Sequence, residues 1–428
     1  MAAPVRFLTG ITTTGTPHLG NYVGAFRPAV EASRRPGTEN FYFLADYHAL
    51  IKCDEPARVQ RSTLEIAACW LAVGLDPERV LFYRQSDIPE ILELTWLLTC
   101  VTGKGLLNRA HAYKAAVEKN TAAGLDPDVD VSAGLFMYPV LMAADILMFK
   151  AHKIPVGRDQ VQHVEMARDI ANSFNHLYGE LLVPPQAQID DTVALLPGLD
   201  GRKMSKSYDN HIPLFAPREQ LRRLIAGIVT DSRAPGEPKQ VEGSALFQIY
   251  EAFASAPETQ RLHQAYAAGI SWSEAKQTLF ERIDGEIAPM RERYEALIAD
   301  PARIERTLKA GAERARAIAT PFMAELRHAV GLRNLAASAV APKAKAAKAA
   351  LPAFKQYREA DGKHYFKLVD ATGRLLAQST GYVSPQDAGR AVARLKREGL
   401  APGEPQLQLA AGVTADQVAA ALRQFATQ

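Results

Sequence analysis

Apolar residues in the first half of the chain follow two spacings, which predict strands and helices in turn. Short apolar runs at 6–10, 40–48 and 79–85 are expected to be buried strands. Residues 59–75 carry apolar positions at helical spacing, and Gly74 marks the end of that helix. A strand–helix–strand order favours a parallel sheet with helices on both faces. The pattern therefore predicts an α/β fold for this part of the chain.

The most apolar stretch, residues 132–149, approaches the length of a membrane span. It contains Asp145 and is interrupted by Pro139. A span needs about 20 apolar residues, and an aspartate at its centre is costly in lipid. We therefore expect a helix buried in a globular core.

Beyond residue 214 the pattern changes to consecutive helices, which continue to residue 335. Residues 336–353 are rich in Ala and Lys and are typical of a linker. Residues 354–428 contain two strand-like runs with Asp-Gly and Thr-Gly turns, and a helix is expected over 384–399. The C-terminal part is thus predicted to be a small separate α+β module.

Charge is distributed unevenly along the 428 residues. Residues 336–428 contain 13 basic and 7 acidic side chains, a net charge of +6, whereas residues 1–335 carry −3. A basic end on a slightly acidic body suggests a nucleic-acid partner. A solvated positive face with no such partner is the alternative.

The three cysteines, Cys53, Cys69 and Cys100, form no metal-binding or redox motif. A sparse, odd number of cysteines suits a reducing compartment, and the N-terminal residues do not have the pattern of a signal peptide. We therefore expect a cytoplasmic protein that has no membrane partner.

A Thr/Gly-rich loop, TGITTTGTPHLGN at 9–21, follows the first predicted strand. GxGxxG and P-loop motifs are absent from the sequence, so this loop is the first candidate for binding phosphate. A helix that begins near Pro17 would offer free N–H groups, His18 and Asn21 offer donors, and Gly20 allows close approach. The alternative is a threonine-rich loop with a helix cap.

A second cluster, KMSKS at 203–207, places two lysines and two hydroxyls in a glycine-bounded loop. Preplaced cations of this kind stabilise the charge that develops on a leaving pyrophosphate. Taken alone, Lys203 and Lys206 are equally compatible with a solvated basic loop.

The two clusters together resemble the signature pair of the class I aminoacyl-tRNA synthetases. The KMSKS motif matches fully, while TPHLGN departs from the His-Ile-Gly-His form at Leu19 and Asn21. Two segments between them, MYPVLMAADI at 137–146 and IPVGRDQVQH at 154–163, closely resemble the bacterial tryptophanyl-tRNA synthetase family. The resemblance extends over residues 5–335.

This resemblance implies a Rossmann-like catalytic domain over 1–213 and a helical anticodon-binding domain over 214–335. It implies a tryptophan–tRNA ligase that uses ATP and Mg²⁺ to form tryptophanyl-adenylate, releases pyrophosphate, transfers tryptophan to tRNA(Trp) and releases AMP. The family is homodimeric. A tyrosyl-type synthetase, a small-molecule nucleotidyltransferase and a non-charging nucleic-acid-binding paralogue are the alternatives.

The resemblance also assigns site residues. The catalytic residues it implies are His18, Asn21, Lys203 and Lys206. Those expected to bind ATP are Thr12, Thr13, Thr14, Gly20, Asn21, Gly157, Arg158, Asp159, Leu196, Lys203, Met204, Ser205, Lys206 and Ser207. Those expected to bind tryptophan are Asp145, Tyr138, Met142, His48, Gln160 and Val156. Protein ligands for a metal are not predicted.

An indole N–H is only a hydrogen-bond donor, so a pocket that selects tryptophan needs one fixed acceptor among apolar groups. The resemblance gives this role to Asp145, with a helix cap or a structural ion pair as the alternatives. His48 has a competing interpretation as a structural histidine at a strand end. Arg158 stands where many family members have Glu, and Lys114 is either a phosphate contact or a surface lysine.

The C-terminal module lies outside the synthetase match and resembles a small bacterial domain of unknown function. Its basic charge predicts that it adds affinity for tRNA or another polyanion.

Overall fold

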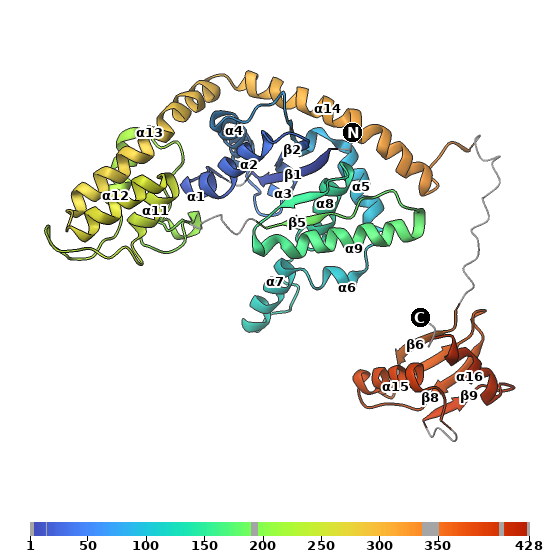
Figure 1. Ribbon diagram of the computed structural model, residues 1–428. Helices are drawn as coiled ribbons and strands as arrows, with labels where there is room; N and C mark the ends of the chain where they lie inside the picture. The colour runs from blue at the N-terminus through green and yellow to red at the C-terminus, as the bar shows by residue number, and fades with distance from the viewer. Residues whose placement is uncertain (1–3, 14, 190–195, 336–350, 402–405, 426–428) are drawn as a thin grey trace. The chain divides into compact units, whose positions relative to one another are not determined.

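The computed structural model describes residues 4–13, 15–189, 196–335, 351–401 and 406–425. The chain forms two compact units, Met1–Arg333 and Asn334–Gln428, which are described separately (Figure 1). Thr14, the side chain of Asp159 and residues 336–350 of the expected linker lie outside the described residues.

A five-stranded parallel sheet forms the centre of the first unit, in the order β3-β2-β1-β4-β5. The strands are β1 (Val5–Thr12), β2 (Thr38–Ala45), β3 (Leu81–Arg84), β4 (Lys153–Pro155) and β5 (Gln186–Gln188). The strand order reverses between β1 and β4, where Phe7 pairs with Lys153. In open parallel sheets, ligands bind beyond the carboxyl ends of the strands at such a reversal.

Alternating side chains of the strands enter two separate cores, as expected for a sheet covered on both faces. Tyr42 and Phe82 belong to one core, whereas Phe41 and Tyr83 belong to the other. The surrounding helices are α1 (Leu19–Asn21), α2 (Arg27–Ser33), α3 (Asp46–Ala49), α4 (Pro56–Val73), α5 (Pro89–Thr99), α6 (Lys104–Leu107), α7 (His111–Ala122), α8 (Ala133–Met148) and α9 (Val161–Tyr178). A π-helical turn spans Tyr22–Phe26, and 3₁₀ turns span Gln85–Asp87, Arg158–Gln160 and Lys206–Tyr208. The predicted α/β class is confirmed.

Two helix predictions are also confirmed. The helix expected over 59–75 is α4, which ends at Gly74 in a left-handed conformation with φ of 106°. The apolar stretch 132–149 forms α8, with Asp145 and Pro139 buried inside the unit. Among the described residues, no helix is long and apolar enough to cross a membrane.

The strand expected over 40–48 is three residues too long. Strand β2 ends at Ala45, and the next residues form the short helix α3. The Asp46 and Gln85 side chains both accept a hydrogen bond from the Tyr47 N–H, which takes this donor away from the sheet. The turn places His48 on a helix at the carboxyl edge of the sheet.

Five helices follow and pack on the same unit: α10 (Arg218–Ala226), α11 (Ala245–Phe253), α12 (Ala256–Ala267), α13 (Trp272–Ala299) and α14 (Pro301–Ala329). Helix α14 crosses β3 so closely that a Cβ at Gly311 would lie 1.8 Å from the Phe82 carbonyl oxygen. The expected division at residue 213 falls inside this compact unit and stays a prediction.

The second unit is a four-stranded antiparallel sheet, β6 (Ala353–Arg358), β7 (His364–Val369), β8 (Leu375–Ser379) and β9 (Leu407–Leu409), with helices α15 (Pro385–Glu398) and α16 (Ala415–Arg423). The helix expected over 384–399 is α15, which Ser384 caps and Gly399 ends. The predicted α+β class of this module is confirmed.

Candidate active site

A cavity of about 1310 Å³ opens at the carboxyl ends of β1 and β4. The six residues predicted to bind tryptophan all line it: His48, Tyr138, Met142, Asp145, Val156 and Gln160. They come from α3, α8, the residue after β4 and the 3₁₀ turn that follows. The structure therefore brings together residues up to 112 positions apart in the sequence.

Asp145 lies at the inner wall of this cavity with 1% of its surface exposed. Its Oδ2 accepts from His48 Nε2 at 2.9 Å, and Gln85 Nε2 donates to Oδ1 at 2.8 Å and to Oδ2 at 3.0 Å. Burial raises the pKa of the carboxyl, while the hydrogen bonds from His48 and Gln85 oppose that rise. A carboxylate has about four acceptor positions, so these bonds orient it without using its whole capacity.

A second hydrogen-bonded chain runs along the cavity wall from Tyr138 through His163 to Gln160. Tyr138 Oη lies 2.6 Å from His163 Nε2, and His163 Nδ1 lies 2.9 Å from Gln160 Oε1. Because Oε1 of an amide only accepts, the imidazole proton is on Nδ1, and Nε2 accepts from the tyrosine hydroxyl. The chain therefore orients the Gln160 amide.

The two sequence motifs meet beside this cavity. Leu19 N donates to the Ile212 carbonyl at 3.0 Å, and Leu214 N donates to the Pro17 carbonyl at 3.0 Å. Lys206 Nζ lies 3.1 Å from the position that a Cβ would take at Gly15. The lysine arm therefore reaches the Thr/Gly-rich loop, from which it is separated by about 190 residues of sequence.

His18 is held in one tautomer by the start of α1. Its Nδ1 accepts from the Asn21 N–H at 3.3 Å, while Asn21 Oδ1 accepts from the His18 N–H at 3.0 Å. Burial, followed by the positive charge of Lys206, lowers the pKa of His18 to about 4. The ring is thus neutral at neutral pH, and its proton is on Nε2, which becomes a fixed donor.

The KMSKS loop is held at its base by Asn210. Asn210 Oδ1 accepts from the Ser205 N–H at 2.8 Å, and Nδ2 donates to Asp200 at 2.7 Å and to the Lys203 carbonyl at 3.1 Å. Asn210 is buried, whereas Lys203 and Lys206 are exposed. Gly198 allows this close packing, because a Cβ there would lie 2.4 Å from the Asn210 side chain.

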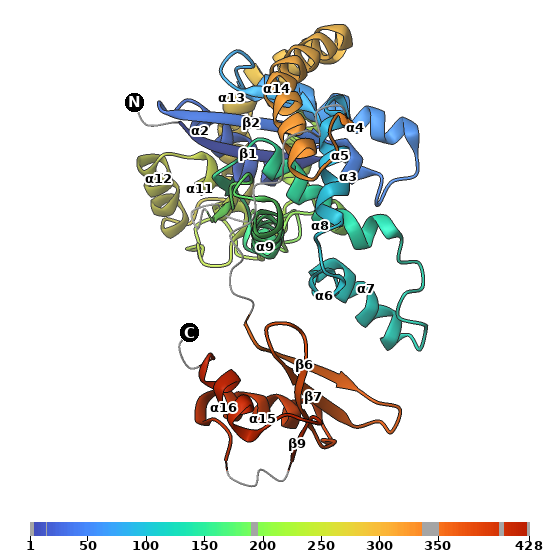
Figure 2. The same ribbon diagram turned by 90° about the vertical axis from the view of Figure 1, so that its right-hand side faces the viewer.

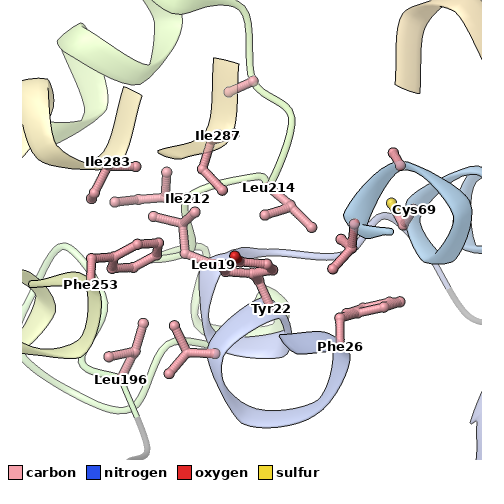
Figure 3. Packing of buried hydrophobic residues seen from close by; sticks show 14 of the residues in the cluster. Leu19, Tyr22, Phe26, Cys69, Leu196, Ile212, Leu214, Phe253, Ile283 and Ile287 are labelled. Atoms are coloured by element: carbon pink, nitrogen blue, oxygen red, sulfur yellow. The ribbon is translucent and has the colours of Figure 1, made fainter. Parts of the chain in front are cut away.

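Below the motifs, side chains from distant segments share one apolar core (Figure 3). Leu19 of the first motif packs there with Leu196 and Ile212, which flank KMSKS, and with Phe253 of α11. The Met204 side chain is buried in the same cluster, so an ATP contact at this residue would come from its backbone. The phosphate-side motifs are therefore joined to the helical region through the core.

The other residues predicted to bind ATP occupy different environments. Thr12, Gly157 and Leu196 line the cavity, whereas Thr13 is buried beside it with a hydroxyl that has no partner among the described residues. Arg158 and Ser207 are exposed, and Ser205 Oγ accepts from the Ser207 N–H. Gly20 lies on α1, where a Cβ would come 3.1 Å from the His18 ring.

Lys114 is exposed on α7 and has no ion pair among the described residues. Cys53, Cys69 and Cys100 form no disulfide among the described residues. Across the described ranges, no group of three His, Cys, Asp or Glu side chains could hold a metal ion.

Sequence reasoning missed Gln85, His163 and Asn210. Gln85 is the last residue of the predicted strand 79–85, and the carboxyl end of a parallel strand is where ligands bind, so its position was a usable signal. His163 is the last residue of the segment 154–163 that carries the family resemblance. Asn210 had no local signal, because its importance comes from the loop that folds over it.

Several arginines of the helical region have intramolecular partners. Arg316 pairs with Glu90 at 3.0 Å, and Arg218 pairs with Asp284 at 2.9 Å. Arg314 donates to the Pro77 carbonyl at 2.7 Å. These three side chains hold helices in place within the unit.

Comparison with known proteins agrees with this geometry. The family model for class I tRNA synthetases of the tryptophan and tyrosine type matches residues 1–286. A model for a domain of unknown function, DUF1508, matches residues 359–402.

Curated relatives match over nearly the whole chain. The tryptophan–tRNA ligase of Xanthomonas campestris pv. campestris is 68% identical over 397 residues, 92% of each chain. That of Pseudomonas aeruginosa is 64% identical over 396 residues, 91% of this chain and 88% of that protein.

A solved structure of the tryptophanyl-tRNA synthetase from Campylobacter jejuni, complexed with ADP and tryptophan, is 39% identical. It matches with a TM-score of 0.70 over 76% of this chain and 100% of that chain. The matched share of this chain is close to the size of the first compact unit.

Proposed function

The chain belongs to the bacterial tryptophan–tRNA ligases of the class I synthetases, and from this premise we propose how its residues perform the reaction. In the first step a carboxylate oxygen of tryptophan attacks the α-phosphorus of ATP, and the bond to the β-phosphate breaks to release pyrophosphate. In the second step a hydroxyl of the terminal ribose of tRNA(Trp) attacks the acyl carbon and AMP leaves. Neither step needs a protein nucleophile, so alignment and charge stabilisation carry the catalysis.

The observation that carries the assignment of the pocket is the buried Asp145, held by His48 and Gln85 at the wall of a cavity that Met142, Ile146 and Val156 also line. Its carboxylate accepts the indole N–H, while Met142 and Val156 contact the ring. The Gln160 amide oxygen, oriented by His163, accepts from the ammonium group of tryptophan. An amino acid without an indole N–H would leave the carboxylate unpaired, which costs about 1–3 kcal/mol or more.

On the phosphate side, the roles follow from the fixed donors and the cationic arm. His18 donates from Nε2 and Asn21 from its amide nitrogen to phosphoryl oxygens. Lys203 and Lys206 neutralise the charge that grows on the leaving pyrophosphate. The Thr12–Thr14 loop takes the remaining phosphate contacts.

The segment 157–159 is assigned to the ribose, with Leu196, Met204, Ser205 and Ser207 beside the nucleotide. The ADP and tryptophan of the Campylobacter relative support a site for both substrates in one cleft.

Mg²⁺ belongs to this proposal only as the counter-ion of ATP. The described residues contain no His, Cys, Asp or Glu cluster suited to hold it, so no step is assigned to a protein-bound metal.

We further propose a homodimer that charges tRNA in the cytoplasm, with each tRNA contacting both subunits. Leu92 and Trp96 support a protein interface, because they lie one helical turn apart on α5 and expose 43% and 68% of their surface. Light scattering of Trp96→Glu tests this, since a dimer interface there predicts monomers, and an unchanged mass contradicts it.

The test of the function is ATP–pyrophosphate exchange with the purified protein, measured with tryptophan, tyrosine and no amino acid. We expect exchange that depends on tryptophan, followed by charging of tRNA(Trp). Equal exchange with tyrosine, exchange without an amino acid, or no exchange would overturn the proposal. The last two results would favour a nucleotidyltransferase for another substrate or a non-charging RNA-binding paralogue.

A further inference from the structure

One face of the C-terminal sheet carries no helix among the described residues of its unit. Helices α15 and α16 lie on the same side of the sheet in both views (Figure 1 and Figure 2). Phe366 and Leu368 of β7 point to that side and share a core with Val392 and Leu395 of α15. Because side chains alternate along a strand, the residues between them point to the opposite side.

Two adjacent cross-strand pairs lie on this opposite side. Tyr357 of β6 is directly opposite Tyr365 of β7, and their rings stack with centroids 5.7 Å apart and an angle of 20°. Lys355 is directly opposite Lys367, whose Nζ lies 5.6 Å from the centre of the Tyr357 ring. Two tyrosine rings and two lysine ammonium groups are thus neighbours on this side of the sheet.

Glutamine side chains continue the row of the two lysines across the sheet. Lys367 pairs with Gln378 of β8, and Gln378 pairs with Gln408 of β9. We call this set the tyrosine–lysine face: Lys355, Tyr357, Tyr365, Lys367, Gln378 and Gln408.

The lysine pair is unfavourable for the sheet itself. Like charges directly opposite each other on neighbouring strands are destabilising. Asp361, in the turn between β6 and β7, accepts from the Tyr365 hydroxyl at 2.6 Å, and no ion pair to Lys355 or Lys367 is found among the described residues. An anion that lies along the row would remove the repulsion.

We propose that the tyrosine–lysine face binds single-stranded RNA, and that its occupant is an unpaired stretch of the tRNA that the ligase charges. Bases stack on tyrosine rings, phosphates pair with lysines, and glutamine amides reach base edges. Duplex RNA offers no exposed base faces for the rings, and an acidic peptide would use the lysines alone. The choice of tRNA rests on the proposed function and on the covalent link, which keeps the module near the bound substrate.

The first experiment measures binding of the full chain to a labelled ten-nucleotide uridine RNA. Tyr357→Thr keeps a strand-forming residue but removes the ring, and we expect it to weaken binding about tenfold. Tyr357→Phe keeps the ring and should bind within about twofold of the original chain. Since loss of fold alone would lower the thermal midpoint of the module, that midpoint is recorded for each variant.

A second pair of variants separates contact from general charge. Lys355→Gln with Lys367→Gln should reduce the slope of log affinity against log salt by about 1.4, since each single-strand phosphate contact contributes about 0.7. Arg390→Gln with Arg397→Gln removes the same charge from exposed positions on α15, on the helix side. This control should leave the slope unchanged. Equal effects of the two pairs, or no effect of Tyr357→Thr, would overturn the proposal.

Aminoacylation of tRNA(Trp) tests whether the RNA bound by this face is the tRNA substrate. Tyr357→Thr should raise KM for tRNA severalfold and leave tryptophan-dependent pyrophosphate exchange unchanged. A loss of oligonucleotide binding with an unchanged KM for tRNA would refute tRNA as the occupant. Absence of exchange in the unmodified chain would instead refute the proposed function, so the two failures are distinguishable.

Discussion

On the tryptophan side of the site the acceptor Asp145 is buried and held by its neighbours, whereas on the phosphate side the two lysines of KMSKS stand exposed on a loop. Asp145 has two protein partners inside the cavity wall. Lys206 extends from a loop whose fixed point, Asn210, lies four residues away. The same cleft therefore combines a rigid recognition element with a catalytic arm that is anchored only at its base.

This difference follows from the two tasks. Rejecting an amino acid of nearly the same shape requires a hydrogen-bond acceptor that is fixed in orientation and shielded from water. Burial of the acceptor provides both. Stabilising a leaving group requires charge that is in place when the bond breaks but allows pyrophosphate to depart. The solvent-exposed lysines of KMSKS can stabilise the leaving group, but they could not select the amino acid.

The largest effect is expected from removing the buried acceptor. With Asp145 present, a tryptophan analogue carrying sulfur in place of the indole N–H should be disfavoured by up to about 10⁴ in kcat/KM. In Asp145→Ala that discrimination should fall to about tenfold or less, since both ligands then lack an acceptor. Pyrophosphate exchange with the two amino acids measures the ratio.

Met142→Leu is the matched control, because it changes an apolar side chain of the same cavity at nearly constant volume. It should preserve discrimination against the sulfur analogue. If Asp145→Ala retains the original ratio while remaining folded, the indole contact lies elsewhere.

Removing the charge of Lys206 should give the next largest effect, which is expected on the reaction rate and not on amino-acid selection. Lys206→Ala is expected to slow tryptophan-dependent exchange by about 10²–10³, with little change in KM for tryptophan. Lys119→Ala, an exposed lysine on α7, is the control and should leave the rate intact. A rise in KM for tryptophan at constant kcat would contradict the charge-stabilising role of Lys206.

The asymmetry also explains what could be predicted from sequence. The apolar stretch 132–149 predicted the buried helix α8, and the family resemblance gave Asp145 its role as the indole acceptor. The contact with Gln85, 60 residues away, depends on how α8 packs against the end of β3, which no local pattern encodes.

Charged helices show the same limit. On α14, Arg316 is paired with Glu90, 226 residues distant. The charge of a helix face is visible in sequence, whereas the partner that neutralises it is known only after the chain has folded.

Replacing Gln85 should shift the pH dependence of kcat/KM for tryptophan. Its hydrogen bonds favour the ionised form of Asp145, so Gln85→Leu should raise the pKa of that carboxyl further. Because the ionised form is the stronger acceptor, kcat/KM for tryptophan should then begin to fall at a higher pH as the solution is acidified. Gln162→Leu, whose side chain bonds to His111 and Arg109 instead, should leave the profile in place.

The smallest effect is expected from replacing Asn210, which holds the base of the KMSKS loop. Asn210→Ala removes the acceptor for the Ser205 N–H and the donor to Asp200, so the loop loses its fixed base and exchange should slow about tenfold. If Asn210 acts by positioning Lys206, the substitution should add little to Lys206→Ala, because both changes remove the same interaction. Additive losses in the double variant would mean that Asn210 supports only the fold. The exchange rates of the two single variants and the double variant, with thermal midpoints recorded in parallel, decide between positioning and general stability.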